Sequence, residues 1–459
     1  LLYASHLSAV ADRLQADATS DPLTGLRNRR AWLTALEDAL AEVEIGRVAV
    51  ALVDLDGFKE VNDSFGHAAG DVALGDVAQR MRDVADDGML AARLGGDEFA
   101  LLVVGTDAEQ RAVVTADRLC RGQQSRIGAI SVSVGASAGI AVSRERDDAS
   151  SILRRADLAM YDAKRARRSQ ATVFSDDMAH RAERRHLLAQ ALPGAAERGE
   201  LEVVYQPLFR LDDGSIAGAE ALVRWRHPLH GDVSPAEFIS LAEEVDVIAE
   251  LGAAVLAAAA RDVAGWDGRL PRLFVNVSPK QLSGAFAASA VATLEQHGVA
   301  PAAVTLEITE SAVPDLHADR CIEQLRAAGF DIAMDDFGSG FSSLSQLAAM
   351  PVDTLKFDRE FIRGIHTPNG RRIVDTIIAL AGELGLTTVA EGIETAAEAD
   401  VVRRAGCDLA QGYHFARPMS AGELTALLAG PTVAASVPAH VSLPVPRRVT
   451  GRAADDLSA

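Results

Sequence analysis

Short apolar runs recur along residues 200–428, and a segment long enough for a helix follows most of them. Their residue types and lengths are typical of buried strands. The runs lie at Leu201–Tyr205, Ala217–Leu222, Phe274–Val277, Val304–Ile308, Ile332–Met334, Thr354–Phe357 and Thr387–Ala390. Repeated strand-helix units over roughly this length predict a closed (β/α) barrel of the TIM type, which typically needs about 250 residues.

A polar residue stands at or just after the end of most of these runs, where a parallel barrel forms its active site. These residues are Glu220, Asn276, Glu307, Asp335, Asp336, Lys356, Glu391 and Gln411. Carboxylates gathered at one barrel mouth repel one another by kcal/mol amounts unless cations lie between them. Oxygen ligands without His or Cys favour Mg²⁺ or Mn²⁺, and the adjacent pair Asp335–Asp336 could bridge two ions. The pattern suits attack of water on a phosphodiester.

The first part of the chain has a different α/β pattern. Gly95–Gly96 predicts a tight hairpin turn, because glycine accepts the positive φ that such turns demand. The turn places Asp97 and Glu98 beside exposed backbone, and a strand ending at Asp54 would bring a further carboxylate close to them. Such a group suits Mg²⁺ with nucleotide phosphates, although these acids taken alone are more typical of a solvated turn. Strands are expected at Val48–Val53, Phe99–Val104 and Ile130–Val142, and helices at Val72–Val84 and Ile152–Arg167.

The charge balance of the chain excludes some classes of binding partner. The chain carries 45 Lys and Arg against 65 Asp and Glu, a formal net charge of −20, which repels nucleic acid polymers and anionic membrane surfaces. The three cysteines, Cys120, Cys321 and Cys407, are far apart and predict neither disulfides nor a zinc site. We expect a cytoplasmic protein, with membrane contact only through any N-terminal part that precedes Leu1 in a longer chain.

Eight ordered motifs between about residue 187 and residue 428 resemble those of the EAL-domain phosphodiesterases of bacterial cyclic-di-GMP signalling. They are Tyr205-Gln206-Pro207, Glu220 to Trp225, Phe274 to Ser278, Leu306 to Glu310, Asp335 to Gly340, Leu355 to Asp358, Ala390-Glu391-Gly392 and Gln411-Gly412-Tyr413. The resemblance implies hydrolysis of cyclic di-GMP to the linear dinucleotide pGpG, in a TIM barrel that needs Mg²⁺ or Mn²⁺.

The same resemblance implies roles for single residues. The expected ligands of the first metal ion are Glu220, Asn276, Glu307 and Asp335, and those of the second are Asp335 and Asp336. Lys356 and Glu391 would hold the attacking water and help to deprotonate it. The substrate would be contacted by Gln206, Arg224 and Gln411, with Arg224 suited to paired hydrogen bonds to a phosphate. Glu310 would anchor the loop after Asp336.

Residues of about 20–172 resemble a GGDEF-domain diguanylate cyclase, a family that joins two GTP molecules held by two facing domains. The matching motifs are Asp21 to Arg30, Asp54 to Asp63, Phe65-Gly66-His67 with Gly70-Asp71, Gly95 to Phe99, and Ala156 to Lys164. By this resemblance the metal ligands are Asp54, Asp97 and the carbonyl of Leu55, while Glu98 binds metal or helps to deprotonate the attacking 3′-hydroxyl. Guanine would be read by Asn62 and Asp71, and phosphates would be bound by Lys59, Lys164 and Arg168.

Two stretches depart from the cyclase pattern. Asp86–Met89 stands where the family has its inhibitory Arg-x-x-Asp product site, so product inhibition at that place is not expected. Arg167 and Ser169 stand where Gly and Asn are usual, which leaves the local loop geometry open.

The organisation predicted from the sequence has five parts: a connecting helix (1–20), a GGDEF domain (21–172), a linker helix (173–199), an EAL barrel (200–428) and a disordered tail (429–459). We expect a bifunctional enzyme of cyclic-di-GMP turnover that uses GTP and cyclic di-GMP and acts as a homodimer. Two alternatives stay open: a phosphodiesterase whose GGDEF domain only binds GTP and regulates the barrel, and a non-catalytic receptor for cyclic di-GMP.

Overall fold

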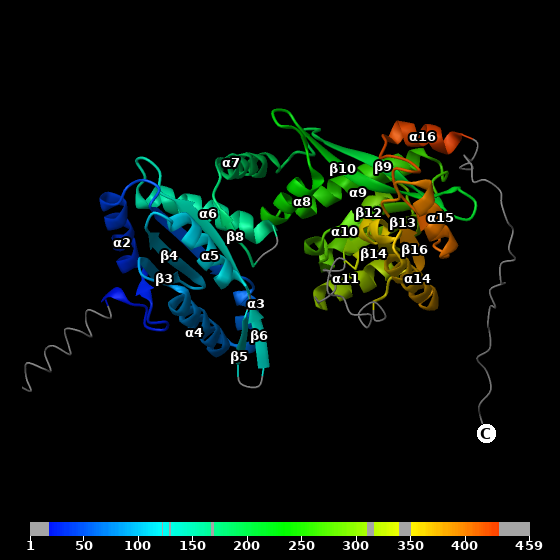
Figure 1. The fold of residues 1–459 in the computed structure, drawn as a ribbon. Coiled ribbons are helices and arrows are strands. Elements are labelled where there is room, and N and C mark those ends of the chain that lie inside the picture. Colours follow the sequence, from blue (N-terminus) through cyan, green and yellow to red (C-terminus); the bar gives the residue numbers. More distant parts are fainter. Residues whose placement is uncertain are drawn as a thin grey trace, which may run out of the picture. The chain divides into compact units, whose positions relative to one another are not determined.

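The computed structural model describes residues 18–121, 123–127, 130–166, 169–309, 316–338 and 350–430. The chain forms two compact units, and the boundary between them lies between Leu187 and Leu188 (Figure 1). Two predicted site residues, Arg168 and Glu310, lie outside the described residues, as do most of the expected connecting helix and nearly all of the expected tail.

The first unit is built on a six-stranded sheet. Its strands in spatial order are β1 (Arg27–Asn28), β3 (Met89–Gly95), β4 (Glu98–Val104), β2 (Val48–Leu55), β7 (Ala136–Val142) and β8 (Ala171–Val173). A separate antiparallel pair is formed by β5 (Gln123–Ile127) and β6 (Ile130–Val134). The single strand expected at Ile130–Val142 is therefore wrong: it divides at Gly135 into two strands of different sheets. The carbonyl of Gly135 accepts a hydrogen bond from Asp56 N at this point.

Helices cover both faces of this sheet. They are α2 (Arg29–Glu42), α3 (Phe58–Phe65), α4 (His67–Val84), α5 (Ala108–Cys120) and α6 (Ala149–Ala166), and α7 (Asp176–Ala191) follows β8. All eight residues of β2 are buried. Ala49, Ala51 and Val53 pack in the core that includes α4 and α5, whereas Val48 and Val50 belong to the core with α2 and α6. A strand that is covered on both faces typically has a continuous apolar sequence, and β2 has such a sequence.

The turn before α2 explains one of the sequence motifs. Asp21 Oδ1 accepts hydrogen bonds from Thr24 N at 2.8 Å and from Thr24 Oγ1 at 2.6 Å. Gly25 then takes a positive φ of 67°, a conformation that favours glycine. Asn28 caps α2 by accepting a hydrogen bond from Ala31 N. The Asp-Pro-Leu-Thr-Gly stretch thus sets the local turn that leads into the first helix.

The second unit is a closed eight-stranded barrel, which confirms the predicted TIM-type fold. Its strands in order are β9 (Leu201–Arg210), β10 (Ile216–His227), β12 (Leu273–Val277), β13 (Val304–Thr309), β14 (Asp331–Phe337), β15 (Thr354–Phe357), β16 (Thr387–Ala390) and β17 (Leu409–Ala410). Strand β9 closes the ring and runs antiparallel to both β10 and β17, while the other neighbours are parallel. A short strand, β11 (Gly231–Val233), pairs with the carboxyl-terminal end of β10.

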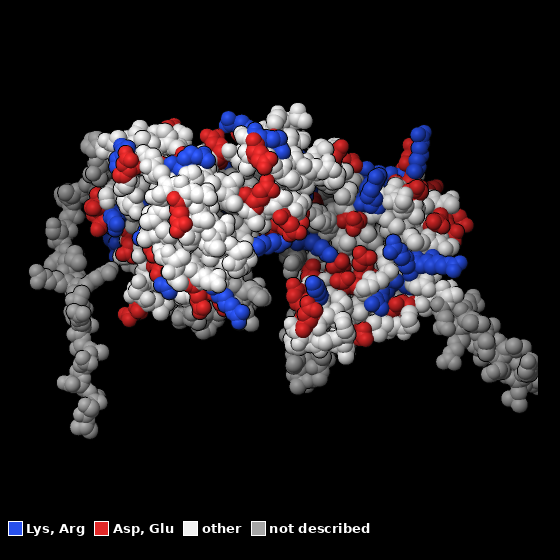
Figure 2. Space-filling model, turned by 180° about the vertical axis from the view of Figure 1, so that it is seen from behind, with Lys and Arg blue, Asp and Glu red and all other residues white. Residues whose placement is uncertain are grey.

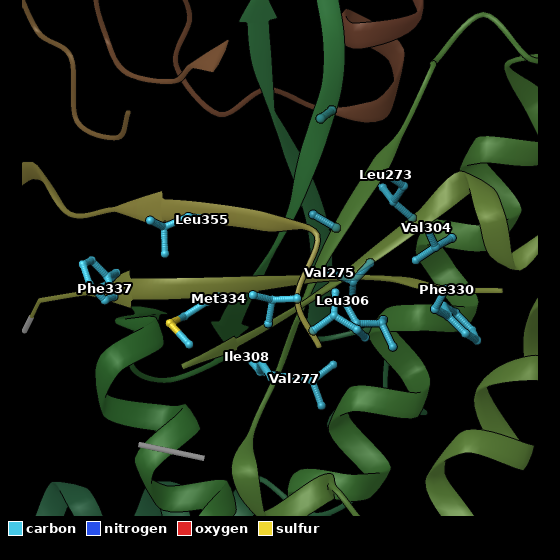
Figure 3. Packing of buried hydrophobic residues seen from close by; sticks show 14 of the residues in the cluster. Leu273, Val275, Val277, Val304, Leu306, Ile308, Phe330, Met334, Phe337 and Leu355 are labelled. Carbon is cyan, nitrogen blue, oxygen red and sulfur yellow. The ribbon is translucent and has the colours of Figure 1, made fainter. Parts of the chain in front are cut away.

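The helices of this unit pack around the barrel. They are α8 (Pro235–Glu244), α9 (Ile248–Gly265), α10 (Gly284–Gln296), α11 (Leu316–Ala327), α13 (Arg359–Gly364), α14 (Pro368–Glu383), α15 (Ala396–Arg404) and α16 (Ala421–Ala429), with 3₁₀ turns η1 (Pro279–Gln281) and η2 (Pro301–Ala303). Figure 3 shows alternate strand residues, among them Leu273, Val275 and Val277, gathered in one apolar cluster. Successive strand residues point to opposite faces, so the residues between these belong to the barrel interior.

The barrel interior has an apolar layer and a polar layer. The apolar layer consists of Leu208, Ala217, Phe274, Val389 and Leu409. Further along several of the parallel strands, the next interior position is polar. Phe274 is followed by Asn276, and Val389 by Glu391. The polar layer therefore lies at the carboxyl ends of the parallel strands, where barrel active sites form.

Acidic and basic side chains are interspersed on the face of the molecule that Figure 2 shows. Within the described residues, no helix combines the length and the hydrophobicity that are needed to cross a membrane.

Candidate functional site

A buried lysine stands at the centre of the polar layer. The side chain of Lys356 on β15 is only 1% exposed. Its Nζ lies 2.6 Å from Glu307 Oε1, 2.6 Å from Glu391 Oε1, 3.2 Å from Asp335 Oδ1 and 3.9 Å from Glu220 Oε2. Four carboxylates from four different strands of the barrel thus converge on one ammonium group.

Amide side chains fix the carboxylate of Glu220 on β10. Asn276 Nδ2 donates to Glu220 Oε1 at 2.7 Å, and Gln411 Nε2 donates to Glu220 Oε2 at 2.7 Å. Gln411 Nε2 also lies 3.1 Å from Gln206 Oε1, and Gln206 Nε2 donates to the carbonyl of Ala416. The structure therefore brings Gln206 and Gln411 together beside the carboxylates.

Two consecutive aspartates reach the same site because β14 is irregular. In a regular strand Asp335 and Asp336 would point to opposite faces. The pairing of β14 with β15 shifts register between Met334 and Phe337, and Asp336 has a positive φ of 54°. Such a bulge turns a side chain away from its regular direction. As a result, carboxylate oxygens of Asp335, Asp336 and Glu391 all lie within 4.8 Å of one another.

The crowded acids shift one another's proton affinities. Burial raises the pKa of Glu307 well above its usual range; Lys356 opposes this rise, and the neighbouring carboxylates add to it. Burial likewise raises the pKa of Glu391 to about 8, against the opposing effect of Lys356. Burial acts to lower the pKa of Lys356, but the surrounding carboxylates, led by Glu220, outweigh it and hold that pKa well above the usual value. The lysine therefore stays charged.

The donor set fits one or two hard divalent cations. With Asp336, whose pKa burial and Asp335 raise, five carboxylates surround one ammonium, a formal charge of −4 when all are ionised. Among the described residues, Glu307 Oε2 has no hydrogen-bond partner, and Glu307 Oε1, Asp335 Oδ1 and Glu391 Oε1 share the single ammonium of Lys356. Buried acceptors of this kind are costly unless a cation or donor satisfies them. Oxygen ligands alone suit Mg²⁺ or Mn²⁺.

Two cavities open beside these carboxylates, and Leu222 lines both. We call the first the acidic cavity; its volume is about 330 Å³, and Gln206, Asp336, Glu391 and Gln411 are among its walls. We call the second the apolar cavity. It has a volume of about 440 Å³ and lies between β10, α8, α9 and the end of β12. Arg224 and Asn276, two predicted site residues, line the apolar cavity.

The first unit gathers a smaller group of charged residues. Asp54, at the end of β2, is directly opposite Glu98 in the antiparallel pairing of β2 with β4. Burial raises the pKa of Asp54, while Lys164 opposes this effect and Asp97 and Glu98 add to it. Lys164 Nζ lies 2.6 Å from Asp54 Oδ1. Gly96, between β3 and β4, has a positive φ of 55°, which confirms the predicted hairpin turn.

The other residues predicted for this site lie on α3, on α4 or at the end of β2. Leu55 is buried, whereas Lys59 and Asp71 are exposed. Asn62 is packed against the start of α4, because a Cβ at Gly70 would lie 2.2 Å from Asn62 Oδ1. The structure therefore places Asn62 beside the turn of helix that carries Asp71.

The sequence reasoning missed Asp56. Its carboxylate accepts hydrogen bonds from Ser137 Oγ at 2.8 Å and from Ser169 N at 2.8 Å. Ser169, one of the departures from the family pattern, has a positive φ of 54°. Asp54 and Asp56, two positions apart on one strand end, thus hold Lys164 of α6 and the segment just after α6. The spacing of Asp54 and Asp56 in the Asp-Leu-Asp stretch is the sequence feature that indicates this role of Asp56.

A barrel with a crowded oxygen-ligand site at the carboxyl ends of its strands has the architecture of a barrel enzyme with a cation site. The chain matches the family model "EAL domain" over residues 189–418 and the model "Diguanylate cyclase, GGDEF domain" over residues 18–170. It therefore belongs to the EAL family and carries a GGDEF domain in tandem with its EAL domain.

Relatives share both parts of the chain. An uncharacterised protein of Mycobacterium tuberculosis is 40% identical over 426 residues, which cover 90% of this chain and 68% of the relative. The cyclic di-GMP phosphodiesterase PdeR of Escherichia coli is 38% identical over 418 residues, 89% of this chain and 63% of PdeR. The bifunctional diguanylate cyclase/cyclic di-GMP phosphodiesterase MucR of Pseudomonas aeruginosa is 39% identical over 424 residues, 90% of this chain and 62% of MucR.

A solved structure, named as the phosphodiesterase of P. aeruginosa MucR in complex with c-di-GMP, is also similar. It has a TM-score of 0.50 and 39% sequence identity, and the match covers 52% of this chain and 99% of that one.

Proposed function

We propose that the barrel hydrolyses cyclic di-GMP to pGpG with Mg²⁺ or Mn²⁺ as cofactor. The observation that carries this proposal is the convergence of Glu220, Glu307, Asp335 and Glu391 on the buried Lys356, with Asp336 close by. The substrate follows from similarity: PdeR and MucR are named for this phosphodiester.

Each residue has a proposed task. The cations would be held by Glu220, Asn276, Glu307, Asp335 and Asp336. When bound there, divalent ions stabilise charge that develops on phosphoryl oxygens and lower the pKa of water.

The remaining groups handle protons and substrate. Glu391, whose pKa burial raises in the metal-free protein, takes up a proton from the attacking water as general base. Lys356 holds the Glu391 and Glu307 carboxylates in place and contributes positive charge. Gln206, Gln411 and Arg224 bind the substrate, and Glu310, outside the described residues, would anchor the loop after Asp336.

A second activity, the synthesis of cyclic di-GMP from two GTP, is proposed for the first unit. The facing pair Asp54 and Glu98, with Asp97 in the adjoining turn, supports it. Asp54, Asp97 and the Leu55 carbonyl would hold the metal of a GTP, and Glu98 would assist at the 3′-hydroxyl.

The other groups of this unit would bind the rest of the nucleotide. Asn62 and Asp71 would read guanine, while Lys59, Lys164 and Arg168 would bind phosphates. Because the reaction joins two GTP molecules on two facing domains, the proposal includes a homodimer. It also includes a cytoplasmic location, where GTP is available.

Product analysis tests both activities. Purified protein with Mg²⁺ or Mn²⁺ is given GTP in one reaction and cyclic di-GMP in another. Cyclic di-GMP or pGpG made from GTP would support the bifunctional enzyme, whereas pGpG made only from added cyclic di-GMP would leave a phosphodiesterase with a regulatory GTP-binding domain. Binding without turnover would indicate a receptor. Glu220→Ala should abolish hydrolysis, Asp97→Ala should not, and equal hydrolysis by wild type and Glu220→Ala would overturn the assigned site.

A further inference from the structure

A groove on the first unit has no part in either proposed activity. It lies between α2 and the start of α6 and has a volume of about 560 Å³; we call it the α2–α6 groove. Its apolar walls include Leu33 and Leu40 of α2 and Leu153 of α6, and these three side chains are only half-buried. The groove therefore leaves apolar surface open beside the core that α2 and α6 share.

The charged residues of α2 are placed against the helix dipole. Arg29 and Arg30 begin the helix, Glu37, Asp38 and Glu42 follow in its second half, and there is no acid in the first turn and no basic residue in the last. Because the amino-terminal end of a helix carries partial positive charge, this order of charges is unfavourable for the helix alone. All five residues are exposed, and none of them forms an ion pair within the described part of the chain.

Four residues of α2 form one ridge along the groove. Arg29, Leu33, Glu37 and Ala41 follow one another at intervals of four residues, and all four line the groove. Rows of this spacing are the ridges that most often interdigitate when two helices pack. Arg29 and Glu37 stand four residues on either side of Leu33, so the ridge carries opposite charges around an apolar centre. These two residues are about 12 Å apart along the helix axis, too far for an ion pair within one copy.

We propose that the α2–α6 groove binds a second copy of this chain, related to the first by a two-fold axis that passes close to Leu33. Such an axis reverses the ridge of the partner, so Arg29 of each copy meets Glu37 of the other. Symmetry repeats this contact and produces two identical ion pairs, with the two Leu33 side chains between them. The order of charges that is unfavourable for α2 alone thus becomes favourable in the pair.

This interface goes beyond the proposed function. None of the residues proposed to bind GTP or metal lines the α2–α6 groove, so the contact differs from the facing arrangement of two domains that the cyclase reaction needs. Because it uses no nucleotide, the pairing through α2 is expected in the absence of GTP and of metal ions.

Charge reversal at exposed positions tests the interface. Sedimentation velocity of the full chain, without GTP or metal and over a range of protein concentrations, measures self-association. The wild type should dimerise, and Arg29→Glu and Glu37→Arg should each weaken dimerisation by about a hundredfold, because symmetry replaces two attractive contacts by two repulsive ones. Arg30→Glu and Asp38→Arg make the same changes of charge at neighbouring exposed residues that do not line the groove. These matched controls should dimerise as the wild type does.

A mixture of the two single variants shows whether the pairing joins two copies. The ridge of Arg29→Glu carries only acids and that of Glu37→Arg only basic groups, so the mixture should form heterodimers, and the double variant should again form homodimers. A wild type that stays monomeric at every concentration would overturn the proposal. Dimers that persist in both single variants would also overturn it, because another surface would then hold them together. Failure of the mixture and of the double variant to dimerise would contradict the pairing of Arg29 with the partner's Glu37.

Discussion

Lys356 Nζ lies 2.6 Å from Glu307 Oε1, and neither side chain is more than 1% exposed. A buried ion pair contributes little net stability compared with apolar residues of the same volume, but the loss of one partner leaves an uncompensated charge and is strongly destabilising. Here the ammonium of Lys356 neutralises part of the charge of several carboxylates, so its removal leaves their mutual repulsion uncompensated.

Lys356→Met is expected to lower the free energy of unfolding of the metal-free protein by about 3–5 kcal/mol. Divalent cations should restore part of this loss, because they supply the missing positive charge at the same place. Urea unfolding with EDTA and with Mg²⁺ measures both effects. Arg226→Met is the control: it removes an arginine from a solvent-exposed pair with Asp232, where a change of less than about 1 kcal/mol is expected. A similar loss in both variants would contradict the central role of Lys356.

Cation binding should strengthen as the pH rises from 6 to 8.5. The pKa of Glu391 is about 8 instead of 4.5, so below pH 8 this group holds a proton that a cation must displace. The folding stability of the metal-free protein depends on pH in the opposite direction. A carboxyl whose pKa rises on folding contributes stability that is full below its ordinary pKa and is lost as the pH rises through the folded value.

Thermal unfolding with and without Mg²⁺ at several pH values measures this dependence. The rise in Tm caused by Mg²⁺ should be larger at pH 8.5 than at pH 6, and Glu391→Gln should reduce the difference. A Mg²⁺ effect that is independent of pH in this range would show that the carboxylates are already ionised at pH 6.

Asp56→Ala is expected to weaken GTP binding by the first unit about tenfold, which corresponds to roughly 1.4 kcal/mol or one charged hydrogen bond. The carboxylate of Asp56 holds the backbone of Ser169, which follows α6 and its proposed phosphate-binding residue Lys164. Titration with GTP and Mg²⁺ measures the change, and Asp63→Ala, at an exposed acid of α3, is the control. Equal GTP affinity in wild type and Asp56→Ala would limit Asp56 to a purely structural contact.

Gly139→Ala should destabilise the first unit and leave hydrolysis by the barrel in place. An added Cβ at Gly139 of β7 would lie 2.0 Å from the carbonyl oxygen of Ala156 and 2.1 Å from Met160 N on α6, so the helix must shift. Overpacking of this kind costs about 1–3 kcal/mol. Gly75→Ala is the control, because the Cβ there meets nothing within 4 Å and alanine favours the helix by about 0.5–1 kcal/mol. A parallel loss of cyclic-di-GMP hydrolysis in Gly139→Ala would show that the barrel depends on the first unit.

The sequence predicted the barrel and the gathering of its acids because both follow from local periodicity. Each run that ends in a polar residue is one parallel strand, and the ends of parallel strands meet at one mouth. The antiparallel direction of β9 cannot be predicted from such a pattern, because the alternation of apolar and polar residues is the same in both chain directions. Strand β17 has only Leu409 and Ala410, too few residues for any period.

Contacts that depend on irregular backbone cannot be predicted from the periodicity of the sequence. A regular strand would have kept Asp335 and Asp336 apart, and only the register shift of β14 brings both to the site. Likewise, the expected strand Ile130–Val142 divides at Gly135, where the Gly135 carbonyl accepts a hydrogen bond from Asp56 N, a contact between segments far apart in the chain.

The buried ammonium of Lys356 also bears on the order of events when the protein is made. In a cluster of acids without an internal cation, the carboxylates would repel one another as the strands close, unless they took up protons or metal. Because β15 brings its own positive charge into the barrel, the ring can close first and take up cations afterwards. The supply of divalent metal would then set how many folded molecules are active, while the number of folded molecules would depend on it far less.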